Sequence, residues 1–352
     1  MLPQPGQYVY LPTRSSFLIP AVNERHTDTT RASAPGALHG LVPGRWLVGA
    51  TLLSLAALVA LMAWENLKVD PFARSSLLLG AVTGLLAATS YVLRNPTTRA
   101  QLIMRDASEY FGLFTIIVLT GAIATYPLSA GTRGFIDPSL ERIDATLRFN
   151  WIAWYDLVAA HRSLQLLGTA AYQSIYLSPA ILLGYFACTG HRAAARGFIA
   201  AFWVAAVLSL LLFPFLPAEG PLAFLWHGPI PYMPESALWE MSLIPELRHH
   251  AMSHVDLGAL RGLVSAPSFH TASAILYIAA AWPFRRLRWP LLVLNLAMLL
   301  STPVEGTHYL ADMIAGALVA IAALGIIAEV RYRLAASAPS ADLPMASLAH
   351  GS

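Results

Sequence analysis

Two histidines, each near the start of an apolar segment, carry the clearest potential for chemistry. His308 and Asp312 are four residues apart, so they share one face of a helix. The Asp312 carboxylate can then accept the Nδ1 proton of His308 and leave Nε2 free to act as a nucleophile or base. His270 opens the other apolar segment, and a second histidine opposite the first can protonate a departing oxygen. These three residues predict a catalytic site.

Two small residues beside the histidines suit the binding of phosphate. Ser268 supplies a hydroxyl, and Gly306 allows the backbone to approach phosphate oxygens closely. A separate pair, His250 and His254, has the i, i+4 spacing of a zinc site on a helix, but no third ligand stands nearby. The sequence therefore predicts no metal and no cofactor.

The composition indicates the kind of protein that must position these residues. The chain has 352 residues, of which 57% are hydrophobic and 12% charged. A soluble domain is usually about 45–50% apolar and about 25% charged, so the numbers favour an all-α protein that crosses a membrane several times. The single cysteine excludes an internal disulfide. The arginines lie in short runs between apolar segments, which argues against a nucleic-acid binder.

The apolar segments are long enough to cross a bilayer, which takes about 20 residues. The sequence predicts about eight transmembrane helices, with His270 opening the sixth and His308 the eighth. The expected spans are 45–64, 76–93, 110–129, 166–187, 197–216, 270–284, 288–304 and 308–329.

The Lys and Arg residues indicate the orientation, because they are enriched in cytoplasmic loops. With the N-terminus inside, 14 of the 22 Lys and Arg residues fall on cytoplasmic segments. Both termini are then cytoplasmic, and both histidines lie at the outer face, which in a bacterial inner membrane faces the periplasm. Two long loops, 130–165 and 217–269, lie on the same side. The first is rich in aromatic residues and predicts an amphipathic segment on the bilayer surface.

The two histidine motifs resemble signature motifs of a known family. Pro267-Ser268-Phe269-His270 and Gly306-Thr307-His308-Tyr309-Leu310-Ala311-Asp312 are similar to the second and third motifs of the type 2 phosphatidic acid phosphatase superfamily. They are most similar to those of its inositol phosphorylceramide synthase branch. Pro217-Ala218-Glu219-Gly220-Pro221 and Leu247-Arg248 resemble segments of bacterial members. The resemblance covers roughly residues 110–330 and implies a six-helix catalytic core.

The resemblance also implies a role for each residue of the two motifs. His308 would attack phosphorus and form a phosphohistidine, and Asp312 would orient His308 and balance its charge. His270 would protonate the leaving alcohol and then activate water or an acceptor alcohol. The implied substrate is a lipid phosphate or a lipid-linked phosphate, and no metal is implied.

The chain departs from the superfamily pattern in its phosphate-binding cations. The first motif, with its Lys and Arg-Pro, is missing, and Thr302 stands where the third motif carries an arginine. Phe269 replaces the glycine before the histidine of the second motif. These departures match the synthase branch. Because phosphate still needs positive charge, we expect it from outer arginines, with Arg248 first and Arg261 and Arg142 behind it.

Three further residues near the motifs are interpreted as parts of the membrane interface. Glu219 and Glu305 are read as interfacial carboxylates rather than supports of the site, and Tyr309 as an interface aromatic. The predicted organisation is a flexible cytoplasmic tail over 1–44, two accessory transmembrane helices over 45–109, a catalytic core over 110–330 and a second tail over 331–352.

The sequence leaves several functions open. Hydrolysis of a lipid phosphate and transfer of a phospho-head group to a lipid alcohol share the same first half-reaction. A proton-coupled transporter could instead use Asp312 and the histidines as a relay, although no internal repeat supports it. A catalytically inactive scaffold is disfavoured by the complete His/His/Asp set. Substrate and membrane lipids are the expected partners.

Overall fold

The computed structural model describes residues 41–336, which lie within one compact unit of the chain. The all-α prediction is confirmed, because the described residues contain no strand and only an isolated bridge between Lys68 and His254. The predicted tails lie largely outside the described residues, which exclude 1–40 and 337–352. The last helix continues past residue 330 to Ala336.

Six helices in the described part of the chain are long and apolar enough to cross a membrane. They make the protein an integral membrane protein, as predicted. The six are α1 (Gly44–Trp64), α2 (Arg74–Val92), α3 (Arg99–Ala130), α6 (Arg162–Thr189), α7 (Arg192–Leu212, continued by the 3₁₀ turn η2, Phe213–Phe215) and α12 (Leu310–Ala336).

The two remaining predicted spans form helices that are weaker candidates for crossing. Helix α10 (Phe269–Ala281) has only 13 residues, and α11 (Arg288–Glu305) has 18. Polar residues within α11, among them Asn295 and Glu305, dilute its apolar character. The count of eight spans therefore stays a prediction. The predicted boundary after residue 109 falls inside α3, which runs without interruption from Arg99 to Ala130.

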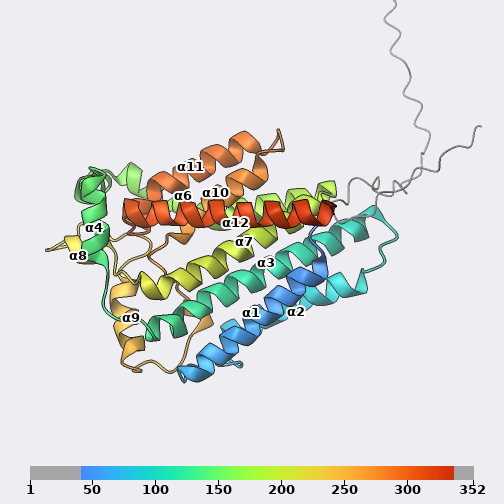
Figure 1. Cartoon of the computed structure of the whole chain (residues 1–352), viewed down its shortest axis with the longest axis horizontal. Coiled ribbons are helices and arrows are strands. Elements are labelled where there is room, and N and C mark those ends of the chain that lie inside the picture. The colour runs from blue at the N-terminus through green and yellow to red at the C-terminus, as the bar shows by residue number, and fades with distance from the viewer. Residues whose placement is uncertain (1–40, 337–352) are drawn as a thin grey trace, which may run out of the picture. The chain divides into compact units, whose positions relative to one another are not determined.

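The long loops fold into short helices that gather at one end of the bundle. Helices α4 (Asp137–Thr146) and α5 (Trp151–Ala160) come from the first loop, and α8 (Pro221–Leu225), α9 (Trp239–Arg248) and the 3₁₀ turn η3 (Leu257–Ala259) from the second. Figure 1 places α4, α8 and α9 together at one end, and the connection between α10 and α11 at the other. That the first loop lies on the bilayer surface stays a prediction.

Small residues let the helices of the core approach closely. Ala200, Ala201 and Ala205 of α7 are buried, and α7 packs against α3, α10 and α12. Such residues are typical of membrane helix contacts, because lipid chains supply no hydrophobic driving force and close backbone packing must replace it. By contrast, Leu53 of α1 and Leu85 of α2 are 69% and 67% exposed, as expected for helix faces that meet lipid.

The segments that carry the two histidine motifs lie in close backbone contact. A Cβ atom on Gly316 of α12 would lie 2.1 Å from the Ser268 carbonyl oxygen, so only glycine fits there. The Ser268 amide also donates a hydrogen bond to the Asp312 carbonyl oxygen, at 3.0 Å. The start of α10 is therefore fixed against the first turns of α12, and this contact sets the spacing between the segments that carry His270 and His308.

Candidate active site

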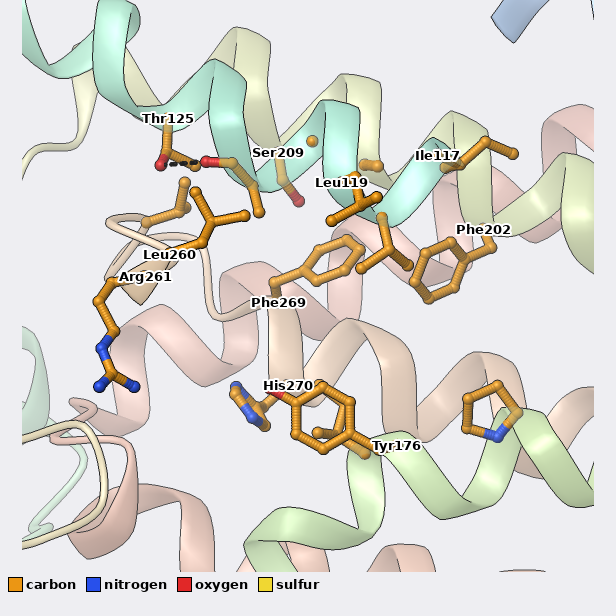
Figure 2. Close-up of a pocket in the computed structure, with 18 of the residues that line it drawn as sticks. Ile117, Leu119, Thr125, Tyr176, Phe202, Ser209, Leu260, Arg261, Phe269 and His270 are labelled. Carbon is orange, nitrogen blue, oxygen red and sulfur yellow. Dashed lines mark hydrogen bonds between the residues drawn. The ribbon is translucent and has the colours of Figure 1, made fainter. Parts of the chain in front are cut away.

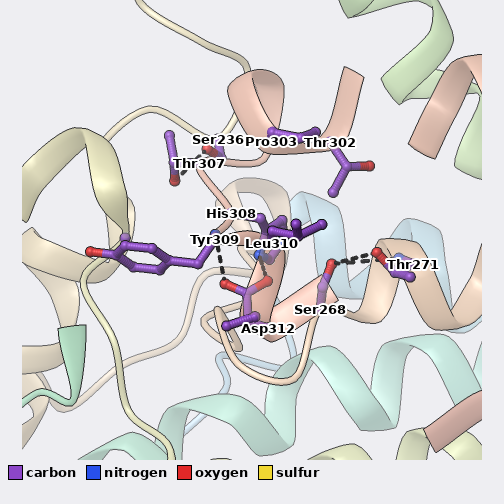
Figure 3. A network of polar contacts seen from close by, with 12 residues as sticks. Ser236, Ser268, Thr271, Thr302, Pro303, Thr307, His308, Tyr309, Leu310 and Asp312 are labelled. Atoms are coloured by element: carbon purple, nitrogen blue, oxygen red, sulfur yellow. Dashed lines mark hydrogen bonds and ion pairs between the residues drawn. The ribbon is translucent and has the colours of Figure 1, made fainter. Parts of the chain in front are cut away.

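His308, in the link between α11 and α12, forms a buried pair with Asp312 in the first turn of α12. His308 Nδ1 lies 3.0 Å from Asp312 Oδ1, and the two residues are 4% and 1% exposed. Figure 3 shows the pair in its network, with Ser268 and Thr307 close by. Burial lowers the pKa of His308, but the nearby Asp312 carboxylate outweighs it and raises the pKa above its usual value. The contact to Asp312 involves Nδ1, and a backbone group of Ser265 also hydrogen-bonds to the His308 ring.

Two carboxylates hold the first turn of α12, which carries this pair. The Tyr309 amide donates to Asp312 Oδ2 at 3.0 Å, as Figure 3 shows. Asp144 of α4 accepts from the Leu310 and Ala311 amides at 2.8 and 2.7 Å. A carboxylate at a helix N-terminus satisfies free N–H groups and interacts favourably with the helix dipole. Helix α4 therefore stabilises the start of α12 from outside.

His270 lies in the first turn of α10, which begins at the N-cap Ser268. The Ser268 oxygen accepts a hydrogen bond from the Thr271 hydroxyl at 3.3 Å. The His270 ring stacks on Tyr172 of α6, with 3.9 Å between the ring centroids. The centroids of His270 and His308 are 6.4 Å apart. The structure thus brings the two predicted histidines together at one end of the bundle.

A cavity of about 560 Å³ leads away from the two histidines between α3, α6, α7 and α10. Most of its walls are apolar, with Phe202, Phe269 and Leu183 among them, whereas the end near the histidines also carries charged side chains. Figure 2 shows Arg261 and His270 on the walls of this pocket, with Phe269 and Phe202 farther along it. A cavity of this size can accept much of a small ligand.

The predicted phosphate-binding arginines are in three different settings. Arg261 lines the cavity, and its guanidinium lies 4.6 Å from the centre of the Trp239 ring. Arg248 instead donates to the Thr132 hydroxyl and the Gly134 carbonyl and covers Phe135, and burial lowers its pKa. Among the residues that line the cavity, Arg261 is the one cationic Lys or Arg side chain.

Arg142, the third predicted cation, is engaged within its own helix. Its guanidinium donates to the Pro138 carbonyl and to the Ser139 hydroxyl of α4, and it does not line the cavity. Gly306, by contrast, does line the cavity. A Cβ atom there would lie 2.5 Å from His308 Cδ2 and 2.8 Å from the Thr302 carbonyl oxygen, so glycine gives His308 its room.

Glu305 is a buried support of the site, so its interpretation as an interfacial carboxylate is wrong. It is 1% exposed. Its carboxylate accepts from the Tyr232 hydroxyl at 2.7 Å and from the Glu235 amide at 3.2 Å. Because Glu305 precedes Gly306, these bonds tie the second outer loop to the segment that carries His308.

Tyr309 is also buried rather than interfacial, contrary to the sequence interpretation. It is 0% exposed, and its hydroxyl donates to Asp137 Oδ1 at 3.1 Å. The same Asp137 carboxylate accepts from the Glu219 and Gly220 amides at 3.0 Å each, and burial raises its pKa. Gly220 has φ +90°, which favours glycine, and its Cα lies against Thr307. Asp137 therefore joins the second outer loop to the His308 segment.

Sequence reasoning missed four residues that the structure brings to the site: Asp137, Asp144, Tyr172 and Glu240. Each comes from a segment far from the histidine motifs in sequence, and none belongs to a recognisable motif. Glu240 of α9 is 6% exposed and lines the cavity, and its Oε2 has no hydrogen-bond partner among the residues that the structure describes. The sequence offers one sign of Glu240, its place near the start of a short helix. Acidic residues are common there because they interact favourably with the helix dipole, so this position does not single it out.

No group of three or more His, Cys, Asp or Glu side chains within residues 41–336 is arranged to hold a metal ion. His250, one half of the sequence pair considered for zinc, lies 3.8 Å from Glu65 Oε2. His254 instead contacts the Ser253 hydroxyl at 2.9 Å through Nδ1.

The comparisons with known proteins agree with the site. No curated protein and no solved structure matches the chain significantly. A family model described as "PAP2 superfamily" matches residues 138–326, more than half of the chain, and this match includes both histidines and Asp312. The chain therefore belongs to the PAP2 superfamily, and this membership indicates a membrane phosphatase or phosphotransferase that acts on phosphoric esters.

Proposed function

We propose that the protein transfers a phosphoryl group from a lipid phosphate, or a lipid-linked phosphate, through a phosphohistidine on His308. One observation carries the proposal. His308 pairs with Asp312 at 3.0 Å and faces His270 at the polar end of a largely apolar cavity. A lipid phosphate has a charged head and apolar chains, so its distribution of polarity matches that of the cavity.

The first half-reaction follows from the roles of the three residues. Nε2 of His308 attacks phosphorus while the bond between phosphorus and the lipid oxygen breaks. His270 donates its proton to that oxygen, and the lipid alcohol leaves. Asp312 balances the positive charge that forms on the His308 ring. Arg261, rather than Arg248 or Arg142, is our candidate to bind the phosphoryl oxygens, because it shares the cavity with the histidines.

The second half-reaction returns the enzyme to its starting state. His270, now neutral, accepts a proton from water or from an acceptor alcohol, whose oxygen attacks phosphorus. The bond between phosphorus and His308 breaks, which frees the imidazole. With water the net reaction is hydrolysis, and with a lipid alcohol it is phosphotransfer.

Phosphotransfer to a lipid alcohol, as in the inositol phosphorylceramide synthase branch, is a second candidate. The apolar walls of the cavity favour it, because they suit a lipid acceptor and exclude water that would otherwise compete for the phosphohistidine. In both cases we propose that the site faces the periplasm of a bacterial inner membrane, on the strength of the distribution of Lys and Arg.

The test is an assay of purified protein in detergent with excess chelator. Wild type and His308→Ala are incubated with a panel of lipid phosphates, with and without diacylglycerol, ceramide or inositol lipids, and products are identified by mass spectrometry. We expect phosphate release, a new lipid phosphomonoester or, from an inositol lipid as donor, a new phosphodiester, and each product should survive chelation and disappear in the variant. Activity that requires a metal, or that survives in His308→Ala, would contradict the proposal.

A further inference from the structure

The Glu240 carboxyl is an unusual group for a site that binds phosphate. It lines the same cavity as His270, His308 and Arg261, it is 6% exposed, and Oε2 has no hydrogen-bond partner within residues 41–336. A buried polar atom without a partner costs free energy, roughly 1–3 kcal/mol, and calls for an explanation. A ligand that completes the hydrogen bond is one explanation.

The charges around Glu240 argue against an ionised carboxylate when substrate is bound. His308 and Asp312 from the α11–α12 region and Asp137 from α4 interact with it electrostatically, as does Tyr172 from α6. Two of these four neighbours are carboxylates. His308 must be neutral to attack phosphorus, so it cannot offset another negative charge. A phosphate would add one or two negative charges to this buried region.

A neutral carboxylic acid, in contrast, fits both the cavity and the ligand. It presents one O–H donor, which the unpartnered Oε2 can direct at an acceptor, and the ionised oxygens of a phosphoryl group are strong acceptors. An apolar site can keep a carboxylic acid neutral so that it donates a hydrogen bond. Burial raises the pKa of Glu240 to about 7, which makes the neutral form accessible under ordinary conditions.

We propose that Glu240, as a neutral carboxylic acid, binds the substrate by donating a hydrogen bond to a phosphoryl oxygen. It supplements Arg261, the one Lys or Arg side chain on the cavity wall within the described residues. This inference rests on the proposed function, because it takes phosphate as the group bound beside His308.

Three variants test the role of Glu240. Glu240→Gln keeps the shape and an N–H donor but cannot ionise, and Glu240→Ala removes the donor. Glu246→Gln, an exposed glutamate on the same helix, is the matched control. Folding of each is checked by gel filtration and thermal unfolding, and kcat/KM is measured from pH 5.5 to pH 9 with the lipid phosphate that wild type uses.

The expected result is a change in pH dependence. Wild type loses its donor as Glu240 ionises, so the ratio of kcat/KM for Glu240→Gln to that of wild type rises above pH 7, by about tenfold per pH unit. Glu240→Ala loses about 10- to 100-fold at neutral pH, and Glu246→Gln matches wild type. Either of two results would overturn the assignment. One is a ratio of kcat/KM that does not change with pH, and the other is a correctly folded Glu240→Gln whose kcat/KM is as low as that of Glu240→Ala. Full activity of His308→Ala in the same assay would instead overturn the proposed function.

Discussion

At the scale of single residues, the sequence predicts the centre of the site but not its surroundings. The spacing of His308 and Asp312 predicts that they pair, but not how: His308 lies two residues before α12 begins at Leu310, so the contact spans the start of the helix and does not lie along one of its faces. The pairing is observed at 3.0 Å. The sequence analysis ranks Arg248 before Arg261, but Arg261 is the one that lines the cavity, because only the folded segment between α9 and α10 decides which guanidinium meets it.

Arg261 gives a prediction at this scale. If its guanidinium binds the phosphoryl oxygens, Arg261→Gln should lower kcat/KM by about 10- to 100-fold, since a hydrogen bond to a charged group contributes about 1.5–3 kcal/mol. The measurement is steady-state kinetics with a lipid phosphate in detergent. Arg133→Gln serves as the control, because Arg133 is an exposed arginine outside the cavity. An Arg261→Gln enzyme with the kinetics of the control would contradict the assignment.

At the scale of elements, the length of the apolar segments predicts where the helices lie in the sequence, but it says little about which contacts hold them in place. All eight predicted spans overlap observed helices, because long apolar segments have few other ways to satisfy their backbone in a membrane. The contact between α4 and the start of α12 could not be predicted. It joins Asp144 to Leu310 and Ala311 across a large distance in sequence, and an aspartate in a loop helix has no distinguishing pattern.

The start of α12 gives the second prediction. Asp144→Ala removes a carboxylate that accepts from two backbone amides, which should cost about 1 kcal/mol of stability. Because that turn precedes Asp312, kcat should fall as well, whereas Asp156→Ala should change neither. Asp156 is an exposed aspartate on α5, the neighbouring short helix. Thermal unfolding and kinetics in detergent check both effects, and a stable Asp144→Ala with undiminished kcat would refute the link between α4 and the site.

At the scale of the whole molecule, composition alone indicates a membrane protein, and the six long apolar helices agree. The loop helices that surround the site lie at the end of the bundle away from the α10–α11 connection (Figure 1). The alternation of the predicted spans along the chain already places these loops at one end, whereas the face of the membrane to which that end belongs stays a prediction from the distribution of Lys and Arg. It could not predict that two acidic residues, Asp137 and Glu305, hold the outer loops against the site, since their partners are backbone amides and hydroxyls.

The orientation gives the third prediction. Cys188, the single cysteine, is exposed near the end of α6. A membrane-impermeant maleimide should label it only after the inner membrane of spheroplasts is lysed. In a Cys188→Ser background, His227→Cys, at an exposed position in the second outer loop, should be labelled without lysis. The reverse pattern would place the site in the cytoplasm.

The central claim is that phosphate is transferred through His308, and trapping the intermediate tests it most directly. His270→Gln should still be phosphorylated by p-nitrophenyl phosphate, whose leaving group needs no protonation, but should release the phosphate slowly because water is no longer activated. After alkaline quenching and proteolysis, mass spectrometry should find the added phosphate on the peptide that contains His308, and not in the His270→Gln/His308→Ala double variant. Phosphate on another residue, or none on a protein that still turns over lipid phosphate, would contradict the account.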